Sequence, residues 1–137
     1  MKIATTVLET RNTVKNWRKE GYTVGLVPTM GFLHEGHASL IKKCREQNDK
    51  VVVSVFVNPT QFGPNEDLEA YPRDLEKDKA LCESLGADLI FHPEPSEMYQ
   101  NPKTYMNIEG LSDNLCGKSR PIHFKGVCTV VSKLFNI

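Results

Sequence analysis

The feature that most constrains the fold is an apolar run at residues 51–57, Val-Val-Val-Ser-Val-Phe-Val, which only Ser54 interrupts. β-Branched side chains favour extended backbone, and a run without polar alternation fits a strand that is buried on both faces. Strands of this kind occur in parallel sheets, whose crossover helices cover both faces. The sequence therefore predicts that this run is a strand of a parallel sheet.

Helical and extended patterns alternate around this run. We predict helices at residues 7–20, 34–47 and 72–85, and strands at residues 23–27 and 88–91. The helices are bounded by residues that cap, open or end helices, namely Thr6, Gly21, Pro72 and Gly86. Further along, residues 104–109 predict a strand, and residues 124–135 a helix or a buried apolar segment. The predicted fold class is α/β, a Rossmann-like doubly wound parallel sheet with three α/β/α layers.

Composition excludes several classes of protein. Lys plus Arg and Asp plus Glu are 17 each, so the formal net charge is zero and offers no basic excess for a nucleic-acid backbone. No apolar run approaches the ~20 residues that span a bilayer, and no hydrophobic signal segment begins the chain. The four cysteines form no C-x-x-C pair. We expect a cytoplasmic protein with buried free thiols, no bound metal, and neither nucleic acid nor membrane as partner.

The segment most informative about function is residues 27–37, Val-Pro-Thr-Met-Gly-Phe-Leu-His-Glu-Gly-His. Pro28 is expected to end a strand there, shortly before a helix begins. Ligands of open α/β sheets bind beyond the carboxyl ends of the strands, and the first turn of a helix offers free N–H groups to an anion. His34 and His37 share one face of the helix, so both rings can donate to one phosphate chain.

The spacing alone leaves other interpretations open. Gly36 and Gly31 would let a nucleotide approach the backbone, but two histidines at a helix start can equally be capping or packed residues. A zinc-protease site fits poorly, because that motif places its histidines four residues apart. The segment matches neither a Walker loop nor G-x-G-x-x-G.

Four colinear segments identify a family, and together they extend over essentially the whole chain: residues 27–37, 53–63, 71–73 and 120–136. The sequence resembles the pantoate–β-alanine ligase (pantothenate synthetase) family of the H-x-G-H nucleotidylyltransferase superfamily. The resemblance implies that ATP, accompanied by Mg²⁺, and pantoate give an enzyme-bound pantoyl adenylate and diphosphate. The amine of β-alanine then attacks the adenylate, which yields pantothenate and AMP. The resemblance also implies a homodimer.

The same resemblance implies roles for individual residues. The ATP site would comprise Met30, Gly31, His34, Glu35, Gly36 and His37. His34 and His37 would contact the phosphates, with His37 the candidate proton donor. Pantoate and β-alanine would be bound by Met30, Asn58 and Gln61, and an amide suits a hydroxy acid because it donates and accepts at once. The weaker candidates for ligand contact are Tyr71, Arg120 and His123.

Two departures from the family limit these assignments. Ile122 stands where members of the family usually have glycine, so the loop around it is expected to differ. Members are also longer, and they add a second glutamine for pantoate, a lysine-bearing segment, a Ser-Ser-Arg-Asn loop and a C-terminal domain. We therefore expect residues 1–137 to be a truncated N-terminal nucleotide-binding domain that is catalytically incomplete. Another H-x-G-H nucleotidylyltransferase and a non-catalytic nucleotide-binding or dimerisation module remain as alternatives.

Overall fold

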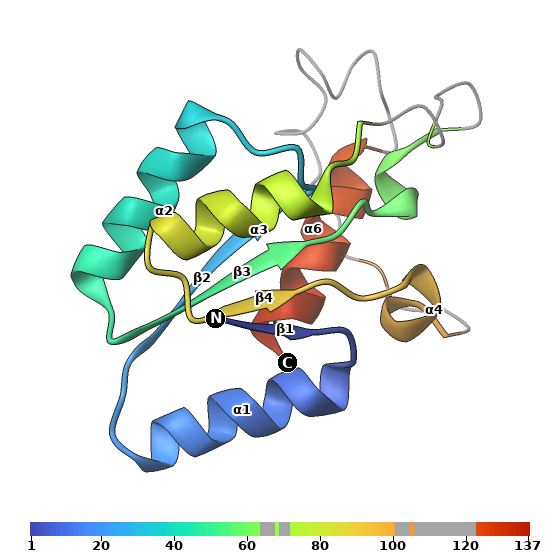
Figure 1. Ribbon diagram of the computed structural model, residues 1–137. Coiled ribbons are helices and arrows are strands. Elements are labelled where there is room, and N and C mark those ends of the chain that lie inside the picture. The colour runs from blue at the N-terminus through green and yellow to red at the C-terminus, as the bar shows by residue number, and fades with distance from the viewer. Residues whose placement is uncertain (64–67, 69–71, 101–104, 106–122) are drawn as a thin grey trace.

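The computed structural model describes residues 1–63, 68, 72–100, 105 and 123–137 (Figure 1). The strands found in these residues form one sheet of order β1-β4-β3-β2, in which neighbours are parallel. They are β1 (Lys2–Ala4), β2 (Val24–Thr29), β3 (Lys50–Val55) and β4 (Leu89–Phe91). The helices are α1 (Val7–Lys19), α2 (Glu35–Gln47), the 3₁₀-helix η1 (Pro59–Gln61), α3 (Leu75–Ser84), α4 (Pro95–Met98) and α6 (His123–Phe135). Within this part of the chain, no helix has both the length and the apolar character to cross a membrane.

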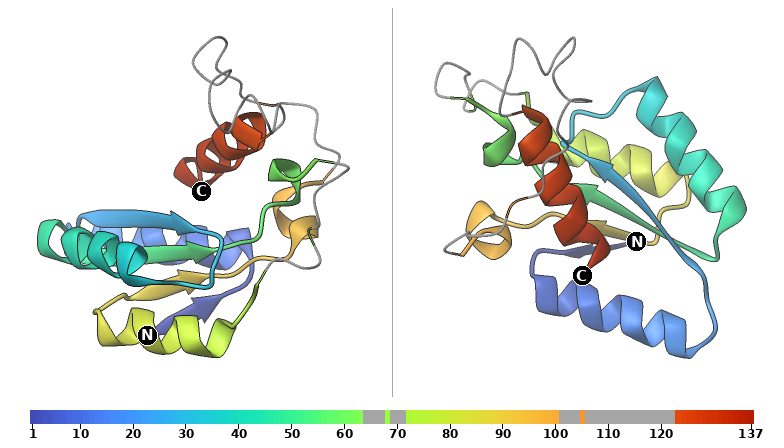
Figure 2. Two further views of the ribbon diagram at one scale, coloured as in Figure 1. Left: turned by 90° about the horizontal axis from the view of Figure 1, so that it is seen from above. Right: turned by 180° about the vertical axis from the view of Figure 1, so that it is seen from behind.

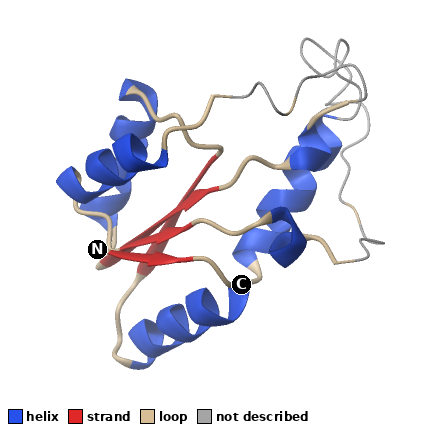
Figure 3. Ribbon diagram, turned by 45° about the vertical axis from the view of Figure 1, so that its right-hand side comes forward, coloured by secondary structure: helices blue, strands red, loops and turns tan. Residues whose placement is uncertain are grey.

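Strand β3 lies between β4 and β2 and is buried on both faces, as the apolar run predicted, because helices cover each face. Val51, Val53 and Val55 belong to one core, against which α2 and α3 pack, whereas Val52 and Phe56 belong to a second core with α1 and α6. Figure 2 shows α6 and α3 on opposite sides of the sheet, and Figure 3 shows helices surrounding the strands. The prediction of a doubly wound parallel sheet in three layers is confirmed.

The predicted helix boundaries agree best with the structure where a residue next to the helix end caps or ends it. The Thr6 hydroxyl accepts the Glu9 N–H at 3.1 Å and begins α1. Gly21 and Gly86, which follow α1 and α3, have φ of 88° and 85°. Only glycine adopts such angles without strain, so these residues end the helices in the manner that the sequence predicted. The apolar segment near the C-terminus is the helix α6.

The expectation that Pro28 ends a strand is wrong. Strand β2 continues through Thr29, and Pro28 lies opposite Ser54 in the register with β3. Proline lacks an N–H group and is tolerated where no neighbour needs that donor. Among the described strands β2 is an edge, which explains the exception. The short strand β1 was not predicted, because three residues are too few to show a pattern.

The expectation that Pro72 opens a helix is also wrong. Helix α3 begins at Leu75, because the Asp74 side chain accepts the Lys77 N–H at 3.2 Å and caps the helix there. The strand predicted at residues 104–109 lies outside the described residues, apart from Tyr105.

The cysteines agree only in part with the expectation of buried free thiols. Cys82 is free and fully buried, whereas Cys44 and Cys128 are free but only half-buried. Burial, together with the nearby Asp78 charge, raises the pKa of Cys82 to about 11. Cys116 lies outside the described residues.

Candidate functional site

The connection between β2 and α2 contains two successive residues in the left-handed region. Gly31 has φ of 83° and Phe32 has φ of 51°. A β-carbon at position 31 would lie 3.0 Å from Val55 Cγ1 and 3.1 Å from Asp78 Oδ2. Glycine is therefore required at position 31 both by the turn and by the close approach of α3.

Side chains, rather than backbone carbonyls, accept the N–H groups of this connection. Phe32 and Leu33 each donate to one carboxylate oxygen of Asp78 at 2.8 Å, and Gly31 donates to Thr29 Oγ1 at 3.1 Å. Asp78 belongs to α3 and is only 2% exposed. The shape of the connection therefore depends on a buried carboxylate that lies far along the sequence.

The two histidines cap α2 reciprocally. His34 is the N-cap residue, and its Nδ1 accepts the Gly36 N–H at 3.0 Å, while His37 Nδ1 accepts the His34 N–H at 3.1 Å. The ring centroids are 4.1 Å apart. A ring nitrogen that accepts a hydrogen bond carries no proton, so the proton of each neutral ring lies on Nε2. Both rings therefore keep Nε2–H as a donor for a ligand.

The surroundings of His37 favour its neutral form. Burial lowers the pKa of His37 and the adjacent His34 ring lowers it further, whereas the Asp78 charge raises it. Protonation would also place a hydrogen on Nδ1 and remove the acceptor of the His34 N–H. The fold therefore favours a neutral ring with a defined tautomer at this position.

The start of α2 differs from the open set of N–H donors that the sequence predicted. The rings of His34 and His37 already accept the N–H groups of Gly36 and His34. An anion at this helix end would meet the Nε2–H groups of the rings in addition to the helix dipole. Capping and ligand binding, which the spacing left as alternatives, are compatible because they use different nitrogens of the same ring.

Gly36 has a requirement that the sequence did not reveal. A β-carbon there would lie 2.9 Å from Cε1 and 3.1 Å from Nδ1 of His34, so a side chain would displace the ring. The open space that we assigned to a nucleotide is therefore occupied by the capping imidazole. Glu35, the first residue of α2, is exposed.

A cavity of about 270 Å³ lies beside His37, between the carboxyl-terminal parts of β2 and β3 and the helix α6. Its lining is mainly apolar and includes Pro28, Met30, Phe56, Val130 and Leu134. Ser54 also lines it, and the Ser54 hydroxyl is buried without a hydrogen-bond partner within the described residues. An open α/β sheet is expected to bind ligands at this position.

Asn58 is fully buried at the end of β3, and its carboxamide joins several elements. Nδ2 donates to the Gly126 carbonyl of α6 at 3.0 Å. Oδ1 accepts the Tyr99 hydroxyl at 2.8 Å, the Thr60 hydroxyl at 2.9 Å and the Thr60 N–H at 3.2 Å. Asn58 thus holds α6, which forms one wall of the cavity, against η1 and the segment after α4.

The remaining predicted residues are only partly described. Gln61 ends η1, but its side chain lies outside what the structure describes. His123 is the first residue of α6. Three positions named from the sequence lie outside the described residues, namely Tyr71, Arg120 and Ile122. In the described part of the chain, no three metal-binding side chains gather at one place.

Sequence analysis missed Asp78 and Tyr99. Asp78 lies three residues after Leu75 and four before Cys82, so it falls on the apolar face of α3. A carboxylate on that face was a usable signal. Tyr99 follows a helix of four residues, and no local pattern indicates that its hydroxyl meets Asn58.

Comparison with known proteins shows the family of this chain. The family model described as "Pantoate-beta-alanine ligase" matches residues 2–137. Relatives named pantothenate synthetase are 65% identical in Ruminiclostridium cellulolyticum and 64% identical in Enterococcus faecalis. Each alignment covers 100% of this chain and 49% of the relative. The chain therefore spans about half the length of the curated relatives it matches.

Solved structures give the same result. The pantothenate synthetase of Thermus thermophilus has a TM-score of 0.87 and 48% identity, covering 98% of this chain and 48% of that one. The pantoate–β-alanine ligase of Francisella tularensis, described as complexed with β-γ ATP and β-alanine, has a TM-score of 0.89 and 42% identity. That match covers 99% of this chain and 52% of the other. The chain belongs to the pantoate–β-alanine ligase family.

Proposed function

We propose that this chain supplies the ATP-binding site of an enzyme that condenses pantoate with β-alanine, and that residues 1–137 are its N-terminal nucleotide-binding domain. The observation that carries the proposal is the reciprocal cap of α2. It fixes two imidazoles through Nδ1 and leaves two Nε2–H donors at the positive end of a helix. With ring centroids 4.1 Å apart, the pair suits the successive oxygens of a triphosphate.

In the proposed reaction, a carboxylate oxygen of pantoate attacks the α-phosphorus of ATP, and the bond to the leaving diphosphate breaks. Negative charge grows on the phosphate oxygens, so N–H donors already held in place stabilise the transition state more than they stabilise bound ATP. Mg²⁺ accompanies the ATP. His37, which the resemblance named as a proton donor, is proposed instead to donate a hydrogen bond from the Nε2–H of its neutral ring. The amine of β-alanine then attacks the pantoyl carbonyl carbon, which forms the amide and releases AMP.

We assign pantoate to the cavity beside His37. Its apolar wall suits the dimethyl carbon of pantoate, and the buried Ser54 hydroxyl adds a polar group. Met30 lines this cavity and belongs to the loop before the histidines. Gln61 is the proposed partner of the polar groups of pantoate, and Asn58 acts through the wall that it supports.

Calorimetric titration of the 137-residue chain with MgATP tests the proposal. His37→Ala and His34→Asn each remove an imidazole Nε2–H, and asparagine keeps a side-chain oxygen where the N-cap needs an acceptor. We expect either substitution to weaken MgATP binding by about tenfold. Ser39→Ala, which removes an exposed hydroxyl further along the same helix, serves as the control and should bind normally. Affinity unchanged in both cap variants would contradict the proposal.

The homodimer that the resemblance implies and the cytoplasmic location expected from the composition are further parts of the proposal. Light scattering tests the assembly, and a chain that stays monomeric at high concentration would contradict that part.

A further inference from the structure

Asp78 is an ionisable group that the proposed reaction does not use. Its side chain is 2% exposed, and no ion pair of the described residues includes it. A buried carboxylate without a cation is costly unless hydrogen bonds replace its lost hydration. Here the hydrogen bonds come from two successive N–H groups, those of Phe32 and Leu33, one to each oxygen at 2.8 Å.

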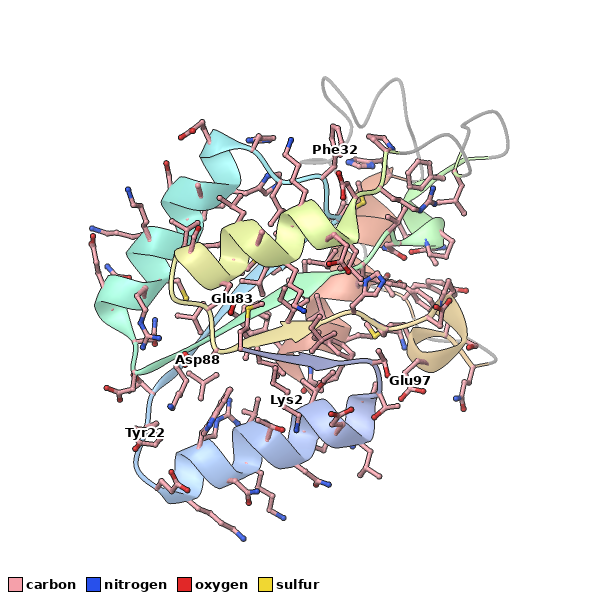
Figure 4. The ribbon with its side chains drawn as sticks, viewed as in Figure 1. Lys2, Tyr22, Phe32, Glu83, Asp88 and Glu97 are labelled. Carbon is pink, nitrogen blue, oxygen red and sulfur yellow. The ribbon has the colours of Figure 1, made fainter. Side chains whose placement is uncertain are left out.

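The residue held most directly is conformationally unusual. Phe32 has φ of 51° although it is not glycine, and its aromatic side chain is 48% exposed. Figure 4 shows this side chain projecting outward from the connection between β2 and α2. An aromatic residue persists in the left-handed region only when its surroundings hold it there. Lys77 Nζ lies 5.9 Å from the centroid of the exposed ring, a weak contact, so the main restraint is the bond from the Phe32 N–H to Asp78.

The two N–H groups that Asp78 accepts, those of Phe32 and Leu33, lie directly before the histidine pair. Leu33, the second residue bonded to Asp78, precedes the N-cap His34, and His34 in turn donates its N–H to His37. The direction in which the chain enters α2 therefore places both the ring of His34 and the His34 N–H that orients the ring of His37. A carboxylate on α3 thereby controls two imidazoles that it does not contact through a hydrogen bond.

We propose that Asp78 is a positioning residue of the ATP site, which holds residues 32 and 33 so that both histidines present Nε2–H to the triphosphate. This role rests on the proposed function for the identity of the ligand. The arrangement of the rings is independent of the ligand and is measured without it.

The experiment compares Asp78→Asn with the unaltered chain in two measurements. Nitrogen NMR of the histidine rings reports the tautomer, and calorimetry with MgATP reports affinity. Asparagine can accept one of the two N–H groups but cannot replace both oxygens. We expect His34 and His37 to lose the uniform Nε2–H signature, and MgATP affinity to fall about tenfold or more. Asp74→Asn is the matched control on the same helix, because asparagine caps equally well, and it should change neither reading.

A second substitution distinguishes positioning from general support of the fold. Asparagine tolerates the left-handed region better than phenylalanine, so Phe32→Asn supplies locally what Asp78 supplies from a distance. Adding Phe32→Asn to Asp78→Asn should restore the Nε2–H signature and part of the MgATP affinity. If Asp78 merely anchors α3, Phe32→Asn will restore neither property.

The outcomes separate this proposal from the proposed function. Normal ring tautomers in a folded Asp78→Asn chain would overturn the positioning role, whatever happens to nucleotide binding. If the unaltered chain fails to bind MgATP, the proposed function fails, but the ring signals still decide whether Asp78 positions the histidines. If Asp78→Asn does not fold, hydrogen exchange in the unaltered chain decides instead. The Phe32 and Leu33 amides should be protected, and rapid exchange of both would overturn the proposal.

Discussion

The connections that follow β2 and β3 both reach the cavity, but they are held in opposite ways. After β2, backbone N–H groups donate to side chains. Three of these bonds join residues two or three positions apart, and two more reach the buried Asp78 of α3. After β3, one buried side chain, Asn58, joins residues as far away in the sequence as Gly126. In the proposed function the first arrangement orients donors for a ligand, whereas the second fixes a wall and contributes to global stability. Substitutions should therefore separate binding from stability.

The largest effect is expected in the second connection. Asn58→Ala leaves the Tyr99 hydroxyl and the Gly126 carbonyl without this buried partner, so the free energy of unfolding should fall by about 3 kcal/mol. Urea denaturation measures the change. Asn136→Ala removes an exposed amide that bonds to Ser132, and it should cost less than about 0.5 kcal/mol. If both variants lost the same free energy of unfolding, Asn58 would contribute no more to stability than an exposed amide.

The next effect belongs to the first connection and concerns binding more than stability. Gly36→Ala places a methyl group within 2.9 Å of His34 Cε1 and displaces the ring. We expect MgATP affinity to fall about tenfold, because a small displacement of a donor is enough to lose its contact. The free energy of unfolding should change little, since alanine favours helix more than glycine does. Ser39→Ala in the same helix is the control, and a normal affinity for Gly36→Ala would show that the ring position is not critical.

The smallest effect is a dependence on pH that should be confined to the first connection. The folded state lowers the pKa of His37 below its ordinary value of about 6.5. The resulting stabilisation is fully present above that ordinary value and is lost as the pH falls through it towards the lower folded-state pKa. NMR titration should place the His37 midpoint below that of an unfolded peptide. In the second connection burial raises the pKa of Tyr99, so no change is expected there near neutral pH.

How much the sequence predicted follows the same division between local and distant contacts. Caps such as Thr6 and turns such as Gly86 depend on neighbouring residues, so the helices and the layered fold were predictable. Pro28 was misjudged because its tolerance depends on which strand lies at the edge of the sheet. The histidine pair was found, but its capping role required coordinates.

The contacts that shape the site from a distance were beyond sequence reasoning. Asp78 meets Phe32 across 46 positions, and Tyr99 meets Asn58 across 41. Neither contact produces a repeating pattern in the sequence, because each involves single side chains from different elements. Family resemblance named the residues that would touch ligands, and it left unnamed the residues that hold them.

Alkylation of Cys82 can report the opening of the core between β3 and α3. Its thiol is completely buried, and a pKa of about 11 leaves almost no thiolate at neutral pH. Since the thiolate is the species that alkylating reagents attack, modification of Cys82 must await an opening of this core. The rate of Cys82 modification therefore reports how often the core beneath α3, the helix that carries Asp78, opens.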